Sequence, residues 1–162
     1  MKLTQERLKE LFSYNPSTGV FTRLHSTSNV KAGRATGNLN TGGHLGFLVD
    51  KKMYQAHRLA WLYVHGDWPN CQIDHINGVR TDNRIENLRD VSHTVNAQNI
   101  HAARSDNKTG LLGVSWKEPR GKYVAQIQID GKVRYLGLFT DPQVAHAKYI
   151  EAKRIHHPGC TI

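Results

Sequence analysis

The chain has 162 residues, with 22 Lys and Arg against 13 Asp and Glu, a net charge of +9 and a pI of about 9.8. This charge predicts a polyanionic partner, with nucleic acid first and a merely soluble basic protein as the alternative. The length suits one domain or two small ones, and the 38% hydrophobic content favours small modules with thin cores. No apolar run is long enough to span a membrane, and MKLTQERLKE at the N-terminus lacks the apolar region of a signal peptide. We therefore expect a cytoplasmic protein with no membrane partner.

The two cysteines, Cys71 and Cys160, occur without a C-x-x-C pair or a paired Cys/His spacing. No structural zinc site is expected from this pattern. A disulfide between the two stays open as an alternative, although nothing in the sequence indicates an oxidising compartment.

The first 55 residues combine a short amphipathic helix with strand candidates and a long polar loop. The expected elements are a helix over Thr4–Phe12, capped by Thr4, and strands over Val20–Arg23, His44–Val49 and Met53–Gln55. Between them, Ser26–Gly43 is rich in Gly, Asn, Ser and Thr, and we interpret it first as a loop. Lys31 and Arg34 in this loop are candidate DNA contacts, because exposed cations suit phosphate oxygens.

A buried helix is predicted for the segment HRLAWLYV, residues His57–Val64. Arg58 is a candidate phosphate contact, with a surface salt bridge as the equal alternative. We expect His57 to make a structural hydrogen bond rather than to bind a metal.

The most informative stretch of the sequence begins at Asp74 and His75. These two residues lie in the run Cys71–Ile76, which is predicted to form a strand. Adjacent strand residues point to opposite faces, so the strand must end or distort here if both side chains serve one site. Asn77-Gly78 is a strong turn signal and supplies that break. The pattern then predicts a second strand over Asn87–Val91 and a helix from His93 to about Ala103, which places Asn96 and Asn99 on one face.

These residue types suit phosphodiester hydrolysis, which needs an activated water and a cation to stabilise charge on the phosphate. A histidine such as His75 can act as the base because its ordinary pKa lies near neutrality. Mg²⁺ prefers hard oxygen ligands and keeps several waters, so one carboxylate and one amide oxygen are a sufficient protein contribution. The alternative is a solvated polar loop with ordinary surface residues.

The spacing of Asp74-His75, Asn87-Leu-Arg and Asn96 resembles the HNH nuclease motif, in the variant that ends in Asn. HRLAW, followed by a Gly and a Trp-Pro, also resembles the segment before this motif in small phage and homing-type endonucleases. The resemblance implies a ββα-metal core with Asp74 and Asn96 as ligands of Mg²⁺ (or Mn²⁺) and His75 as general base. It also implies that Asn87 orients the His75 ring, while Asn83 matches the polar loop and is kept as a catalytic candidate.

The C-terminal third follows a different pattern, in which three strand candidates precede one helix. The expected elements are strands over Leu111–Lys117, Lys122–Asp130 and Lys132–Phe139, and a helix that starts at Asp141-Pro142. Alternation places Tyr123, Ala125, Ile127 and Ile129 toward the helix, and Lys122, Val124, Gln126 and Gln128 away from it. The alternative is a sheet whose polar face is merely solvated.

LGVSWK, GKYVAQIQ, YLGLF and AHAKYIEA in this region resemble the plant ethylene-response-factor (ERF, or APETALA-two) DNA-binding domain. The resemblance implies a sheet that enters the major groove of DNA. The candidate DNA contacts are Ser115, Lys117, Arg120, Lys122, Gln126, Gln128 and Arg134. Several of these positions are Arg in the plant domains, so a base preference does not transfer.

Together these patterns predict an α+β protein with an HNH ββα-metal nuclease core and a small three-stranded antiparallel sheet packed by one helix. The predicted parts are an N-terminal DNA-contacting region (1–55), the nuclease core (56–103), a linker (104–110) and the ERF-like domain (111–162). The predicted function is metal-dependent nicking or double-strand cleavage of double-stranded DNA, in phage or mobile elements and thus in a bacterial host. One active site per chain favours a monomer, with a dimer as the alternative. The alternative functions are a non-catalytic DNA-binding regulator with an HNH-derived core, and an RNA-binding accessory protein.

Overall fold

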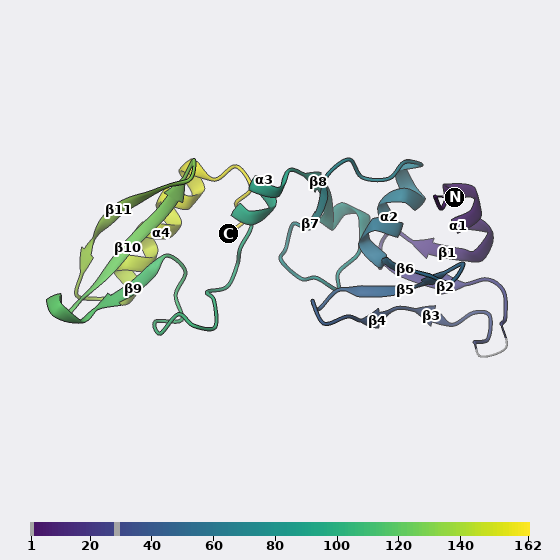
Figure 1. The fold of residues 1–162 in the computed structure, drawn as a ribbon, viewed down its shortest axis with the longest axis horizontal. Helices are drawn as coiled ribbons and strands as arrows, with labels where there is room; N and C mark the ends of the chain where they lie inside the picture. The colour runs from purple at the N-terminus through teal and green to yellow at the C-terminus, as the bar shows by residue number, and fades with distance from the viewer. Residues whose placement is uncertain (1, 28–29) are drawn as a thin grey trace. The chain divides into compact units, whose positions relative to one another are not determined.

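The computed structural model describes residues 2–27 and 30–162 and divides into two compact units, Met1–His93 and Thr94–Ile162 (Figure 1). Residues 28–29 of the predicted loop 26–43 lie outside the described residues. Each unit is described by itself. Among the described residues, no helix combines the length and the apolar character that crossing a bilayer requires.

The first unit begins with helix α1 (Gln5–Leu11), whose start is capped by Thr4: its hydroxyl accepts from the Arg7 amide at 3.3 Å. The chain then forms an antiparallel sheet of β1 (Phe12–Asn15), β2 (Val20–Arg23) and β3 (Ala35–Thr36). The predicted helix, its Thr4 cap and the predicted strand over Val20–Arg23 (β2) are confirmed, while β1 was not predicted.

A second sheet contains β4 (Asn38–Leu39), β5 (Leu45–Val49) and β6 (Lys52–Gln55). Asp50 and Lys51 have φ of 45° and 67°, which allows a tight turn between β5 and β6, the two strands predicted over His44–Val49 and Met53–Gln55. Helix α2 (Ala56–His65) follows β6 directly and ends at Gly66, whose φ of 87° is left-handed.

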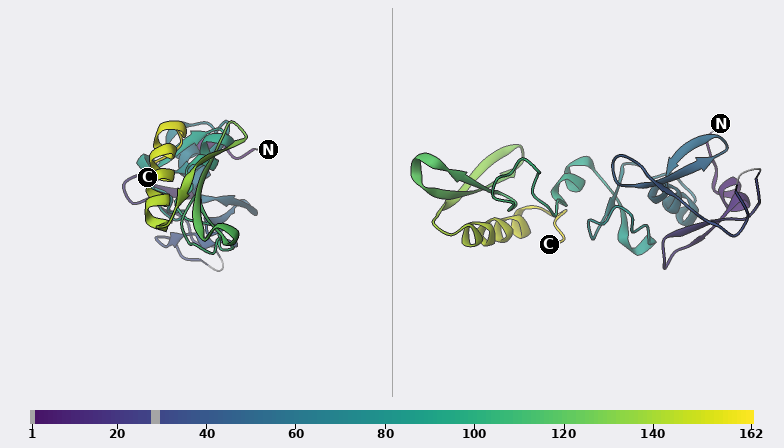
Figure 2. Two further views of the ribbon diagram at one scale, coloured as in Figure 1. Left: turned by 90° about the vertical axis from the view of Figure 1, so that its left-hand side faces the viewer. Right: turned by 90° about the horizontal axis from the view of Figure 1, so that it is seen from below.

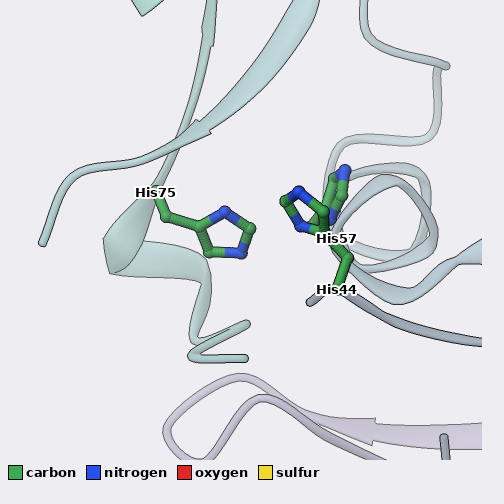
Figure 3. Close-up of side chains that lie close together, drawn as sticks. All are labelled: His44, His57 and His75. Carbon is green, nitrogen blue, oxygen red and sulfur yellow. The ribbon is translucent and has the colours of Figure 1, made fainter. Parts of the chain in front are cut away.

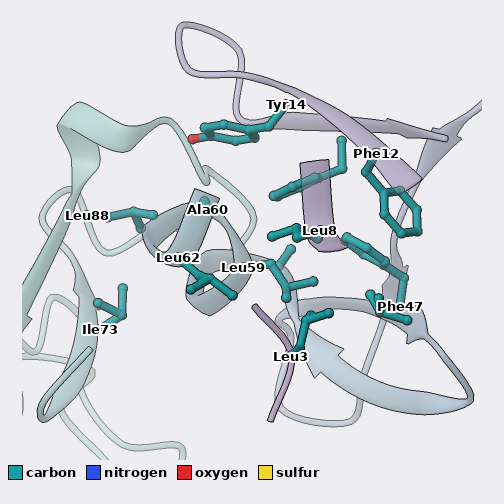
Figure 4. Packing of buried hydrophobic residues seen from close by; sticks show 13 residues of the cluster. Leu3, Leu8, Phe12, Tyr14, Phe47, Leu59, Ala60, Leu62, Ile73 and Leu88 are labelled. Carbon is teal, nitrogen blue, oxygen red and sulfur yellow. The ribbon is translucent and has the colours of Figure 1, made fainter. Parts of the chain in front are cut away.

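The core of the first unit combines aliphatic side chains with a group of aromatic rings and packs α1 and α2 against the neighbouring strands (Figure 4). The Phe12 and Phe47 rings lie 5.0 Å apart between centroids, and the Tyr14 and Phe21 rings 4.7 Å apart. Leu59 and Leu62 of α2 are at most 1% exposed, so α2 is a buried helix, as its sequence predicts.

The unit ends with a two-stranded antiparallel sheet that carries the predicted motif. Its elements are β7 (Gln72–His75), the 3₁₀ turn Ile85–Asn87 and β8 (Leu88–Val91). Helix α3 (His93–Gln98) falls almost entirely within the second unit and is shorter than predicted. At its end the Asn99 amide donates to the Asn96 carbonyl at 3.0 Å, a bond of the tighter 3₁₀ type, and the Asn99 side-chain oxygen accepts a hydrogen bond from the Thr161 hydroxyl at 2.6 Å.

The second unit contains a three-stranded antiparallel sheet with helix α4 along one face (Figure 2). The strands are β9 (Val114–Lys117), β10 (Lys122–Ile129) and β11 (Lys132–Phe139), in the order β11-β10-β9, and the helix is α4 (Pro142–His156). The Asp141 carboxylate accepts from the Gln143 amide at 2.7 Å, which confirms the predicted cap. The predicted architecture of three antiparallel strands and one packed helix is therefore confirmed.

Two expectations for this unit need correction. Val124 was assigned to the polar face, yet it is 7% exposed, in register between Ser115 of β9 and Leu138 of β11. The segment 104–110, predicted as a linker, is fastened to the sheet: the Asn107 amide donates to the carbonyls of Leu111 and Val114 at 3.0 and 3.2 Å.

Candidate active site

Asp74 and His75 stand at the end of β7, and their register with β8 fixes their surroundings. Asp74 pairs with Arg89 and His75 with Leu88 across the two strands. The strand ends at His75, and the Gly78 amide donates to the His75 carbonyl at 2.8 Å, so the turn predicted at Asn77-Gly78 is confirmed. Asp74 and His75 are 6% and 4% exposed, so both side chains lie in a largely water-excluded environment.

The Asp74 carboxylate forms an ion pair with Arg89. Nε of Arg89 lies 2.8 Å from Oδ2 of Asp74, and a terminal guanidinium nitrogen lies 2.7 Å from the same oxygen. A carboxylate is a hard oxygen donor of the kind that Mg²⁺ prefers, and in this structure its cationic partner is the Arg89 guanidinium. The chemistry of Asp74 therefore fits its predicted role as a metal ligand, although Arg89 is a contact that the sequence analysis missed.

The His75 ring is held by Asn83, whose side-chain oxygen lies 3.0 Å from Nε2. Because an amide oxygen only accepts hydrogen bonds, a neutral His75 donates from Nε2 and carries its lone pair on Nδ1. Asn83 is 1% exposed, and its Nδ2 has no hydrogen-bond partner among the residues described. The predicted catalytic candidate Asn83 thus lies in contact with the predicted base.

The N-terminal hairpin braces the segment that carries Asn83. The Tyr14 hydroxyl donates to the Asn83 carbonyl at 2.6 Å, and the Ile85 amide donates to the Pro16 carbonyl at 3.2 Å. Gly19 has φ of 72°, and a Cβ there would lie 2.5 Å from the Asn83 carbonyl carbon. Only glycine therefore allows the β1–β2 turn to approach this closely.

The Asn87 side chain contacts the turn between the strands, and its predicted role in orienting the His75 ring stays a prediction. Its amide donates to Asn77 Oδ1 at 3.0 Å and to the Asp82 carbonyl at 2.8 Å, and its oxygen accepts from the Asn77 backbone amide at 2.9 Å. Asn87 fixes the loop between the strands, and Asn83 at the end of that loop contacts the ring.

Asp82 adds charge to the same loop. It accepts from the Asn77 side chain at 2.7 Å and from Arg84 at 2.8 and 2.7 Å. The hydrogen bonds from Arg84 are the main reason why the pKa of the Asp82 carboxyl is lowered to about 2. The loop therefore stays cross-linked through an ionised carboxylate at neutral pH.

Two further histidines lie beside His75 (Figure 3). His44 precedes β5 and His57 lies in the first turn of α2; one ring nitrogen from each of His44, His57 and His75 lies within 4.8 Å of the others. Ring centroids are separated by 4.9 Å for His44–His57, 5.1 Å for His57–His75 and 5.6 Å for His44–His75. We predicted that His57 makes a structural hydrogen bond. For its Nδ1 atom this prediction is wrong, because Nδ1 is buried without a partner among the described residues. No local sequence signal brings these three segments together.

Burial favours the neutral form of all three rings. It is the main cause that lowers the pKa of His57 to about 3, and the neighbouring His75 and His44 lower it further. Burial likewise lowers the pKa of His44 and of His75, against the opposing effects of Asn83 and Asp74 on His75. His75 is therefore in the proton-accepting form at neutral pH.

The remaining candidates of the first unit lie on its surface. The Arg58 guanidinium donates to the Cys71 carbonyl at 3.3 Å and lies 5.9 Å from the centre of the Trp68 ring. Lys31 and Arg34 are exposed in the loop before β3. Asn96, the other predicted metal ligand, lies on α3 and belongs to the second unit, so its role stays a prediction.

Most of the predicted DNA contacts of the second unit share the sheet face opposite α4. Lys117 pairs with Lys122, Gln126 with Tyr135 and Gln128 with Val133, and paired residues point to the same side. We call these six residues the outer face, and all six are exposed. Tyr135 and Val133, which the sequence analysis did not select, are 61% and 65% exposed there.

The other predicted contacts are placed differently. Arg134 pairs with Ile127, whose side chain packs in the core beneath α4, so its register belongs to the helix side of the sheet. Ser115 is half-buried opposite Val124, and Arg120 is exposed in the 3₁₀ turn between β9 and β10. A bulge between Ala125 and Gln126 shifts the β11 register, which simple alternation does not predict.

Comparison with known proteins adds two findings. Residues 54–98, which include α2, β7, β8 and the whole of α3, match the family model described as HNH endonuclease. The chain is 31% identical over 86 residues to "Protein 3.8" of Escherichia phage T7, and the match covers 51% of this chain and 70% of that protein. No solved structure matches the chain significantly.

Proposed function

Since this chain belongs to the family of Protein 3.8 of Escherichia phage T7 and matches the HNH endonuclease model at residues 54–98, we propose that it hydrolyses DNA phosphodiester bonds. The observation that carries the proposal is the buried pair of Asp74 and His75, in which Nε2 of His75 lies 3.0 Å from an amide oxygen. A neutral imidazole fixed in one tautomer beside a carboxylate is suited to general-base catalysis.

In this proposal, Nδ1 of His75 accepts a proton from the water that attacks phosphorus. The new oxygen–phosphorus bond forms as the bond to the leaving ester oxygen breaks, and solvent returns a proton to that oxygen. Asn83 keeps the His75 ring oriented because its side-chain oxygen accepts a hydrogen bond from Nε2–H throughout. A general base at such a position typically contributes about 10²–10⁴-fold to the rate.

Asp74 would hold the divalent cation, Mg²⁺ or Mn²⁺, with Asn96 as the second predicted ligand. When bound, the cation supplies charge stabilisation to the phosphate oxygens in the transition state. Both Arg89 contacts go to Oδ2 of Asp74, so a cation held by this carboxylate would share it with the guanidinium.

The second unit would bind the DNA through its outer face. Lys117 and Lys122 supply charge there, the two glutamines supply hydrogen-bonding groups and Tyr135 supplies an exposed ring. Residues 104–162 contain ten Lys and Arg against five Asp and Glu, so this part contributes +5 of the total +9. Phosphate contacts set affinity and its salt dependence, which fits a binding role for this region. We retain nicking by a monomer as the expected mode, in the setting of a phage or a related mobile element.

The direct test is incubation of supercoiled plasmid with the protein and Mg²⁺ or Mn²⁺, with and without a chelator. Conversion to nicked circles that stops when chelator is present supports the proposal. Intact supercoiled plasmid at saturating protein, with either cation, contradicts it.

The second candidate function is a non-catalytic DNA-binding protein. The observation that favours it is the Asp74–Arg89 ion pair, which already neutralises the carboxylate that a catalytic cation would need. This alternative predicts a gel shift on varied DNA duplexes with no cleavage under any metal condition.

A further inference from the structure

The histidine cluster of His44, His57 and His75 contains more ligating atoms than the proposed cleavage reaction uses. Only His75 has a role there, yet three ring nitrogens lie within 4.8 Å of one another (Figure 3). Nδ1 of His44 and Nδ1 of His57 are buried and have no hydrogen-bond partner among the residues that the structure describes. A buried polar atom without a partner is costly, and binding of an ion is one way to offset that cost.

The chemistry of the cluster selects one class of ion. Imidazole suits Zn²⁺ and its neighbours in the first transition row, whereas carboxylate and water suit Mg²⁺. Zinc–nitrogen bonds are about 2.0–2.1 Å long, so the three nitrogens, which lie within 4.8 Å of one another, would move closer together around one ion by side-chain rotation. The hydrogen bond from Nε2 of His75 to Asn83 is the outer contact that fixes the tautomer of a metal-binding histidine.

We propose that His44, His57 and His75 form a second metal site, for a transition-metal cation of the Zn²⁺ class, and that an ion bound there inhibits DNA cleavage. Binding would use the lone pair on Nδ1 of His75, so this nitrogen could no longer accept a proton from the attacking water. The inhibitory part rests on the proposed nuclease function, whereas the binding part does not. Asp74 and His75 are adjacent in β7. The inhibiting ion and the catalytic ion would therefore bind different side chains of the same active site.

The first experiment measures binding without DNA, by titrating the full-length protein with Co²⁺ as a spectroscopic probe for the Zn²⁺ class. Tetrahedral nitrogen coordination should give visible absorption bands that added Zn²⁺ abolishes. His44→Gln is the informative variant because His44 is only half-buried and takes no part in the proposed chemistry. We expect it to weaken Co²⁺ binding on the order of 100-fold or more, since losing even an outer contact of a ligand typically costs about 10- to 100-fold.

The matched control is His156→Gln, an exposed histidine at the end of α4. This variant should bind Co²⁺ as wild type does. That result would show that Co²⁺ binding depends on the cluster and not on any of the ten histidines in the chain alike. Zn²⁺ should also raise the melting temperature of wild type, but not that of His44→Gln. Equal Co²⁺ affinity in wild type and His44→Gln overturns the proposed site.

The second experiment measures nicking in excess Mg²⁺ while Zn²⁺ is increased. Wild type should lose activity as the cluster fills, and His44→Gln should nick at the wild-type rate and resist Zn²⁺ to much higher concentration. Zn²⁺ that binds the cluster but leaves the nicking rate unchanged, or raises it, overturns the inhibitory role. If wild type fails to nick in Mg²⁺, the proposed function fails, while the Co²⁺ titration still decides the metal site.

Discussion

The two units place their candidate functional residues in opposite environments. In the first unit, Asp74, His75 and Asn83 are at most 6% exposed, and named contacts hold each of them. In the second unit, the outer face is exposed, and Lys117 and Lys122 project from it. The difference indicates that proton transfer depends on fixed geometry, whereas attraction to a polyanion depends on accessible charge.

The cores differ in the same sense. The first unit packs interlocking aromatic rings such as Phe12, Phe21 and Phe47, and the hairpin beside them supports the Asn83 segment. The second unit relies on small residues: Ala125 and Ala145 are fully buried where α4 lies on the sheet. Changes inside the first unit should therefore affect catalysis and stability together, and changes on the outer face should affect binding alone.

After the loss of the proposed base itself, the largest expected effect comes from Asp74→Asn. The amide keeps an oxygen for Arg89 but removes the charge that a divalent cation needs, so nicking should fall by about 10²- to 10³-fold, from several kcal/mol of lost stabilisation. The measurement is single-turnover nicking in Mg²⁺, beside a binding assay that should show near-normal DNA affinity. Asp67→Asn, at an exposed position after α2, is the control and should behave as wild type.

Tyr14→Phe tests whether the hairpin supports the base through Asn83. The change leaves the buried Asn83 carbonyl without its 2.6 Å hydrogen bond, so the free energy of unfolding should fall by about 1–3 kcal/mol. Denaturant unfolding measures this loss, and the nicking rate should fall with it. Tyr54→Phe, whose ring packs on Trp68, is the control. If Tyr14→Phe has the nicking rate and the stability of wild type, the hairpin does not support the base through Asn83.

Asp82→Asn tests the charged loop through its pH dependence. The pKa of the Asp82 carboxyl is lowered from its ordinary 3.8 to about 2, so its ionised form stabilises the folded state. That contribution is fully present above pH 3.8 and is lost as the pH falls through about 2. Thermal unfolding between these pH values should show a steeper loss of stability in wild type than in Asp82→Asn. Parallel curves for the two proteins would mean that the Arg84 contacts carry no net stability.

The smallest expected effects come from the outer face. Lys122→Ala should weaken DNA binding and reduce the magnitude of the salt slope by about 1, while nicking at saturating DNA stays unchanged. Arg134→Ala is the matched comparison, because its register lies on the helix side of the sheet. Salt titrations of both variants distinguish the faces: a larger loss for Arg134 than for Lys122 would move the DNA contact off the outer face.

The sequence predicts the local features of the site well, because those features depend on neighbouring residues. The end of β7 at Asp74-His75 follows from the Asn77-Gly78 turn, and α2 and α4 follow from their periodicity and end signals. The predicted roles of Asp74 and His75 rest on residue type and spacing, and they stay predictions until activity is measured.

The features that the sequence did not predict depend on long-range packing. The Asn83–His75 contact requires a loop that Tyr14 holds from 69 positions away. His44, His57 and His75 come from a loop, a helix and a strand that are distant in the sequence. No local sequence pattern predicts that these segments lie together. The hydrogen bond between the Asn99 and Thr161 side chains, just beyond the end of α3, likewise spans 62 positions.

The most direct test of the central claim is single-turnover nicking by His75→Ala at saturating DNA and Mg²⁺, with DNA affinity measured in the same buffer. The account predicts that the nicking rate falls by about 10²–10⁴-fold while the affinity stays near wild type. A variant that nicks at the wild-type rate would show that His75 is not the base and would contradict the proposed active site.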